Sequence, residues 1–145
     1  MNWLNHDHGN FELAVYKCRT ACDASDWPLV QCTFREFASR YKSHMHAEEE
    51  ALFLAYDAHP GTTTDPTDSL KADHTQILRL MEHISELLDV GSYESLAEDV
   101  SLLYRTMIKH HEKEEEIFLP MASEALFPNR DTITADLKRH ITVRD

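Results

Sequence analysis

The sequence predicts an all-α protein that folds as an antiparallel up-down-up-down four-helix bundle with a short C-terminal helix. Three observations lead to this prediction. Among 145 residues there are only 3 Gly and 5 Pro, and β-branched runs are few, which favours helices over strands. Apolar residues recur at helical spacing in four long stretches. The second half of the chain repeats the pattern of the first, and at this length we expect a single domain, residues 1–145.

The first helix is predicted from Trp3 to about Ala24. His8 lies within its apolar stripe, whereas His6 falls on the opposite side. The apolar members of the stripe are Leu4, Phe11, Val15, Cys18 and Cys22. We interpret both cysteines as packing residues.

The second helix is predicted to begin after Ser25 and Asp26, which can cap its first turn, where Pro28 also fits. It should run to about Asp57, before a loop at residues 59–64. Its stripe mixes apolar and ligand-type side chains: Val30, Phe34, Phe37, Tyr41, His44, Glu48, Leu52 and Ala55.

Asp65, Pro66 and Asp68 mark the start of a third helix, which Gly91 ends. Its stripe is Leu70, His74, Ile77, Met81, Ile84 and Leu88. Ser92 is expected to cap the fourth helix, and Pro120 to end or kink it within a turn. The stripe of that helix is Leu96, Val100, Leu103, Met107, His110, Glu114, Ile117 and Met121.

A last helix is predicted from Asp131 to about Val143, because Ile133, Leu137 and Ile141 follow helical spacing. We expect it to pack across one end of the bundle.

An offset of 66 residues superposes two parts of the chain, about 3–57 and 69–123. His44-Met45-His46-Ala47-Glu48 falls on His110-His111-Glu112-Lys113-Glu114, and His8 falls on His74. The chain is therefore predicted to contain two pseudo-repeats, related by an approximate two-fold axis along the bundle.

Each pseudo-repeat offers a lone His and a His-x-x-x-Glu pair. Side chains four residues apart share one face of a helix, so His and Glu at this spacing can point at one place. His46 with Glu50 and His111 with Glu115 have the same spacing and are rivals. The offset favours the pairs at 44/48 and 110/114, and His46 lies on a polar face, whereas His111 is less clearly excluded.

Burying imidazoles and carboxylates in apolar stripes costs several kcal/mol for each unpaired group, which divalent ions would offset. With two His and two bridging carboxylates, each of two ions would have four protein ligands and room for another. Iron is the predicted metal, as an oxo- or hydroxo-bridged di-iron centre, with manganese or zinc as alternatives. The predicted ligands are His8, His44, Glu48, His74, His110 and Glu114.

The remaining polar side chains are assigned to the surface or the core. We interpret five histidines as surface residues: His6, His46, His59, His83 and His140. Glu49, Glu50, Glu115 and Glu116 are expected to be solvated, and Tyr41 to be a core residue, with contacts to the metal ligands as the alternative. Desolvation should lower the pKa of the buried imidazoles, so that the metal-free protein is acid-sensitive.

The net charge of −12 argues against nucleic acid and anionic membranes as partners. No apolar run reaches the length of a membrane span, and the N-terminus lacks the features of a signal peptide, so we expect a cytoplasmic protein. Three cysteines without a C-x-x-C motif predict reduced thiols.

With its two His-x-x-x-Glu pairs and two lone histidines, the chain resembles the haemerythrin-like HHE cation-binding domains over residues 3 to 124. The branch that includes iron–sulfur cluster repair proteins is more similar than the oxygen carriers. The resemblance implies a di-iron four-helix bundle with the six ligands named above. Oxygen-carrying haemerythrins have a further His where this chain has Leu78.

These features predict a non-haem di-iron protein whose reduced centre reacts with dioxygen, nitric oxide or peroxide in sensing, storage or detoxification. A di-iron redox enzyme (a peroxidase or nitric oxide reductase) and an iron donor for cluster repair are the alternatives. A redox partner protein is a further candidate partner.

Overall fold

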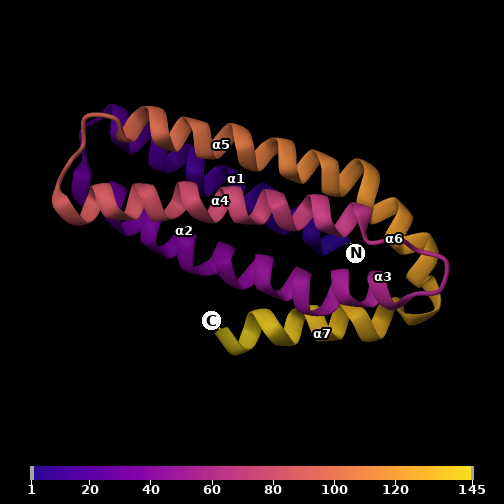
Figure 1. The fold of residues 1–145 in the computed structure, drawn as a ribbon. Helices are drawn as coiled ribbons and strands as arrows, with labels where there is room; N and C mark the ends of the chain where they lie inside the picture. Colours follow the sequence, from indigo (N-terminus) through magenta and orange to yellow (C-terminus); the bar gives the residue numbers. More distant parts are fainter. Residues whose placement is uncertain (1, 145) are drawn as a thin grey trace.

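In the computed structural model, which describes residues 2–144, four antiparallel helical rods form a bundle (Figure 1). The first rod is α1 (Asn2–Asp23) and the third is α4 (Asp65–Val90). The second joins α2 (Trp27–Ala47), a π-helical segment η1 (Glu48–Phe53) and α3 (Leu54–Ala58). The fourth joins α5 (Leu96–Lys113), a π-helical segment η2 (Glu114–Phe118) and α6 (Leu119–Leu126). A 3₁₀ turn, η3 (Phe127–Asn129), leads to α7 (Arg130–Arg144).

The order of contacts confirms the predicted up-down-up-down bundle. Helix α1 packs against α2 and α5, and α4 packs against the same two helices. Within residues 2–144 the structure contains no helix that is long and apolar enough to span a membrane.

Local chemistry sets the start of α2 and the end of α4, as the sequence predicts. The Asp26 carboxylate accepts a hydrogen bond from the Leu29 N–H, and Pro28 lies in the first turn of α2. Gly91 ends α4 in a left-handed conformation (φ 70°), and its N–H bonds the carbonyls of Leu87 and Leu88.

Of the two predictions about the fourth rod, the one about its cap is wrong. Ser95, not Ser92, precedes its first helix, because the loop must let Tyr93 stack on Trp27 with ring centroids 4.4 Å apart. Pro120 is predicted to end or kink the rod; the rod does not end there, since it continues to Leu126, but it bends (Figure 1). A proline removes an N–H and clashes with the carbonyl four residues earlier, but here the regular α-helical pattern is already interrupted by η2. Figure 1 shows α6 bending away from the line of α5 beyond this segment.

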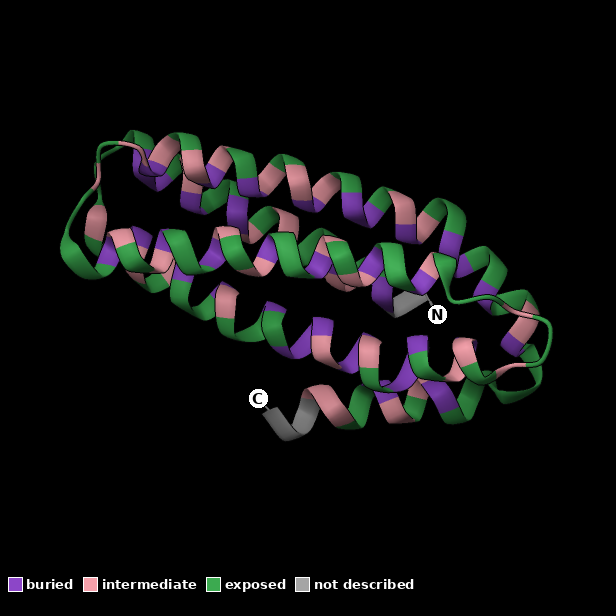
Figure 2. Cartoon of the chain, in the orientation of Figure 1, coloured by how far each residue is buried: buried purple, intermediate pink, exposed green. Residues whose placement is uncertain are grey.

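Two apolar clusters fill the interior, where the buried faces of the rods meet (Figure 2). The larger one, here called the main core, extends from the site to the loops at 24–26 and 91–95. It includes Val15, Phe37, Tyr41, Ile77, Leu103 and Met107. The smaller one, here called the end core, surrounds Phe53 and Phe118. Along each rod, the predicted metal ligands lie between these two cores.

The last helix forms as predicted, but it does not pack across the end of the bundle. Helix α7 runs back along α2 and η1 (Figure 1). Its apolar residues Ile133 and Leu137 are buried in the end core. A stripe predicts which face of a helix is buried, but not which neighbour covers it.

Candidate metal centre

The six predicted ligands lie together in the layer between the two cores. Each is at most 2% exposed. His8 on α1 and His74 on α4 come one turn after buried leucines, Leu4 and Leu70, so the apolar stripe that folds each helix also turns its histidine inward.

Both glutamates stand at the first residue of a π-helical segment. Segment η1 begins at Glu48 and η2 at Glu114, which are equivalent positions of the two pseudo-repeats. Short π-helical segments within α-helices are rare and frequently accompany functional sites. The wider turn re-aims the residues that follow the glutamate, so that Phe53 and Phe118 enter the end core.

The six side chains form two groups that share both carboxylates. His8 and His44, with Glu48 and Glu114, are here called the first half-site; His74 and His110, with the same two glutamates, are the second. In each group the candidate ligand atoms lie within 4.8 Å of one another. This arrangement fits two metal ions bridged by two carboxylates.

Short distances within the groups show where the imidazoles point. The Nε2 atoms of His8 and His44 lie 3.2 Å apart. His74 Nε2 lies 3.4 Å from a Glu48 oxygen, and His110 Nε2 lies 3.4 Å from a Glu114 oxygen. All four imidazoles therefore direct Nε2 toward the shared carboxylates.

The atoms at the centre of the site lack hydrogen-bond partners. Both carboxylate oxygens of Glu48 and of Glu114 are buried without one, as are Nε2 of His74 and of His110. Buried polar groups are almost always satisfied, and leaving several unpaired in one place costs several kcal/mol. Metal ions would satisfy these atoms, so the residues present fit a metal centre.

A ring of carboxylates holds the outer nitrogens of three of these histidines. His8 Nδ1–H donates to Glu115 (3.0 Å), His74 Nδ1–H to Glu49 (2.9 Å), and His110 Nδ1–H to Asp73 (3.0 Å). With Nδ1 protonated, each Nε2 keeps its lone pair for a metal. For Glu49 and Glu115 the alternative to solvation holds, because each reaches across the bundle to a histidine.

The fourth histidine is held less closely. His44 Nδ1 lies 3.9 Å from the nearest oxygen of Asp7 and has no hydrogen-bond partner. Asp7 and Asp73 are equivalent in the two pseudo-repeats, but only Asp73 is braced by a lysine, Lys113, at 2.8 Å.

Charge at the site opposes the expected pKa shifts. Burial lowers the pKa of His8, but the Glu114 and Glu48 carboxylates outweigh it and raise that pKa to about 9. Burial acts in the same way on His110, and Asp73 and Glu114 raise its pKa to about 9. The predicted lowering by desolvation is therefore wrong for these two histidines, because it left out the carboxylates.

His111 is a further buried histidine that stands outside both groups. Its Nδ1–H donates to Glu12 (2.7 Å), which leaves Nε2 to accept a hydrogen bond from the Tyr41 hydroxyl (2.8 Å). Its ring stacks on His8 with centroids 3.9 Å apart. Burial, with His8 and His110 nearby, lowers the pKa of His111.

The rival ligands do not join the site. Glu50 and Glu116 are exposed, as predicted. His46 points away from the centre but is partly buried, because α7 brings His140, which is also partly buried, to 6.1 Å from it, measured between ring centroids. Of the other histidines read as surface residues, His6 and His83 are exposed, and His59 is partly buried.

Sequence reasoning missed Asp7, Asp73 and the array of Glu12, His111 and Tyr41, and it gave contacts of Glu49 and Glu115 to the ligands only as the alternative. A signal for part of this was present, because Asp7-His8 and Asp73-His74 repeat at the offset of 66, as do Glu49 and Glu115. The array carries no such signal, since its counterparts at the same offset are Leu78, Met45 and Met107.

Comparison with known proteins gives one family. The family model described as "Hemerythrin HHE cation binding domain" matches residues 1–122 and also residues 65–144. No curated protein and no solved structure matches the chain.

Proposed function

The chain belongs to the haemerythrin HHE cation-binding family, and on that premise we propose that it is a non-haem di-iron protein whose reduced centre reacts with a small uncharged ligand. Dioxygen, nitric oxide and hydrogen peroxide are the ligands of this kind that we propose. Mixed imidazole and carboxylate ligation without thiolate suits iron, with manganese and zinc as alternatives.

One observation carries the proposal. Two groups of four buried ligands share Glu48 and Glu114, and the shared oxygens have no other partner. A pair of redox-active ions at such a site would supply electrons and open positions for a small ligand.

The residues of the chain divide the tasks around that centre. His8 and His44 would hold one ion, His74 and His110 would hold the other, and Glu48 and Glu114 would be shared by both. The outer carboxylates fix the imidazole orientation. Two apolar cores keep bulk water away on either side.

The number of histidines available to each ion favours reaction with the small ligand over reversible carriage of oxygen. Leu78 stands one turn after His74, so the second half-site gains no further imidazole there. With two histidines for each ion, the chain's own ligands would leave both ions an open position.

Metal analysis followed by anaerobic stopped-flow mixing tests the proposal. The purified protein should hold about two iron ions per chain, and the reduced form should react with oxygenated buffer, with peroxide and with nitric oxide. Turnover with an added reductant would favour an enzyme, and transfer of iron to an acceptor protein would favour a donor. A protein that retains its metal but shows no spectral change with any of the three ligands would overturn the proposal.

A further inference from the structure

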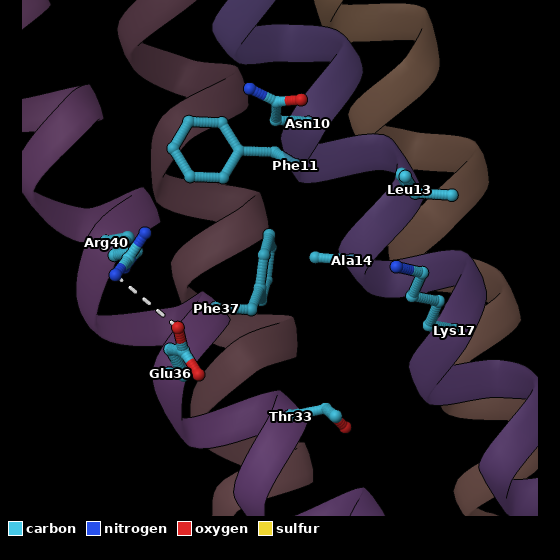
Figure 3. A pocket seen from close by; sticks show the side chains of 9 residues that line it. All are labelled: Asn10, Phe11, Leu13, Ala14, Lys17, Thr33, Glu36, Phe37 and Arg40. Carbon is cyan, nitrogen blue, oxygen red and sulfur yellow. Dashed lines mark ion pairs between the residues drawn. The ribbon is translucent and has the colours of Figure 1, made fainter.

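A groove of about 240 Å³ lies between α1 and α2, close to the first half-site. Phe11 and Phe37 project into its middle, and Lys17, Glu36 and Arg40 surround them (Figure 3). Figure 3 also shows Arg40 paired with Glu36, at 3.4 Å. The groove offers several times the roughly 30 Å³ that one water molecule occupies in the liquid.

Phe11 touches the groove and the metal ligands at once. Its ring centroid lies 5.2 Å from that of His44 and 4.9 Å from that of Tyr41, with the rings edge to face in both pairs. The side chain is partly exposed, because it also lines the groove. The groove therefore ends one aromatic ring away from the first half-site.

The equivalent position beside the second half-site is closed. Ile77, the counterpart of Phe11, is 0% exposed. Leu103 and Met107 are buried, as are their counterparts Phe37 and Tyr41, so the two sides differ in exposure at Phe11 and Ile77. A ligand approaching the second half-site along the equivalent direction would have to part a close-packed aliphatic core, where packing leaves few voids larger than a water molecule.

We propose that the groove between α1 and α2 binds small uncharged ligands on their way to the centre, and that the Phe11 ring is the gate between the groove and the first half-site. This inference rests on the proposed function. The two phenyl rings give the groove an apolar middle, which favours uncharged molecules over anions. Rotamer changes of exposed side chains take picoseconds to nanoseconds, so the partly exposed Phe11 can open and close the path without unfolding of α1.

Stopped-flow mixing of the reduced, iron-loaded protein with nitric oxide tests the gate. Phe11→Ala should raise the association rate constant by about tenfold, which corresponds to about 1.4 kcal/mol off the barrier to passage. Phe11→Trp should lower the rate constant. Ile77→Ala is the matched control, because it shortens the equivalent side chain on the closed side, and it should leave the rate constant near that of the wild type.

A second control guards against an unfolded variant. Ile77 is fully buried and its truncation can destabilise the bundle, so Leu102→Ala is tested beside it. Leu102 is 41% exposed on α5 and lies outside the groove, so its loss should change neither folding nor the rate constant. Equal acceleration by Phe11→Ala, Ile77→Ala and Leu102→Ala would overturn the gate.

Xenon provides a readout that does not depend on reactivity. In crystals of the iron-loaded protein under xenon pressure, xenon should lie against Phe11 and Phe37, and in Phe11→Ala it should move toward His44. Absence of xenon from the groove in both proteins would overturn the groove as a binding place. If xenon binds as expected but the wild-type protein reacts with none of the three ligands, the proposed function fails and the binding place stands.

Discussion

The two half-sites have the same ligand types but different surroundings. Each has two histidines on neighbouring rods, and both share Glu48 and Glu114. Beside the first half-site lie the polar array of Glu12, His111 and Tyr41, and the partly exposed Phe11. The residues at the equivalent positions beside the second are all apolar: Leu78, Met45, Met107 and Ile77.

This difference helps to distinguish two roles, holding the metal and controlling access to it. The repeated residues are those that would hold metal, and they match in both halves. The residues without a repeated counterpart, such as His111, Tyr41 and Phe11, contact His8 or His44 without belonging to either group. They are therefore the residues that would control access to the first half-site and its rigidity. Variants at paired positions can therefore test one role while the other stays constant.

The largest effect is expected where the half-sites are joined. Glu48→Ala or Glu114→Ala removes a carboxylate shared by both groups, so each should empty both metal positions. His44→Ala and His110→Ala should each weaken mainly their own half-site. Metal content after gel filtration measures this.

Exposed or outward-facing neighbours serve as controls for that loss. Glu50→Ala and His46→Ala change residues of the same rod outside both groups, and should leave about two ions per chain. A loss on His46→Ala equal to that on His44→Ala would contradict the assignment of ligands.

A smaller effect is expected from the outer carboxylates, and it should be unequal. Asp73→Asn replaces a direct partner of His110 at 3.0 Å, whereas Asp7→Asn replaces a residue 3.9 Å from His44. Loss of an outer partner typically costs about 10- to 100-fold in metal affinity, so Asp73→Asn should weaken metal binding by that factor and Asp7→Asn by less. Competition with a chelator measures both, and equal losses would show that the two half-sites are held alike.

The polar array should matter for stability more than its apolar counterpart. Tyr41→Phe leaves Nε2 of His111 buried without a donor, which costs about 1–3 kcal/mol. Met107→Leu, at the equivalent position, keeps volume and should cost less than about 1.5 kcal/mol. Urea unfolding of the metal-loaded proteins compares them. A Tyr41→Phe cost no larger than that of Met107→Leu would show that the array adds nothing to stability.

A further effect concerns pH in the metal-free protein. The pKa of His8 and of His110 is raised to about 9 in the folded state, against an ordinary value near 6.5. The stability from these charged imidazoles is fully present below pH 6.5 and is lost as pH rises through 9. Thermal melts should therefore show the metal-free protein losing stability between these limits, with little change in the metal-loaded form. Stability that increases over that range without metal would contradict the shifts.

Much of the fold follows from local chemistry, which is why the sequence predicts it. The stripes, the Asp26 cap and the Gly91 stop all depend on residues within a few positions of one another. The failures depend on distant contacts. Tyr93 needs Trp27, and the place of α7 depends on the surface that α2 and η1 offer.

The same distinction between local and distant contacts applies to the candidate metal centre. The six residues of the two groups could be predicted because the repeat selects them among several His and Glu pairs at equal spacing. Acidic residues such as Glu49 and Glu115 are usually solvated, so nothing local shows that they reach a histidine on another rod. The array could not be predicted, since His111 finds its partners 70 and 99 residues away and has no repeated counterpart.

The central claim is that two metal positions share Glu48 and Glu114 and divide the four histidines between them. Anomalous diffraction at the iron edge, from crystals of iron-loaded protein, tests it most directly. We expect two peaks, one contacted by His8 and His44 and the other by His74 and His110, with both glutamates contacting both peaks. A single peak, or a peak contacted by His46 or His111, would contradict the account.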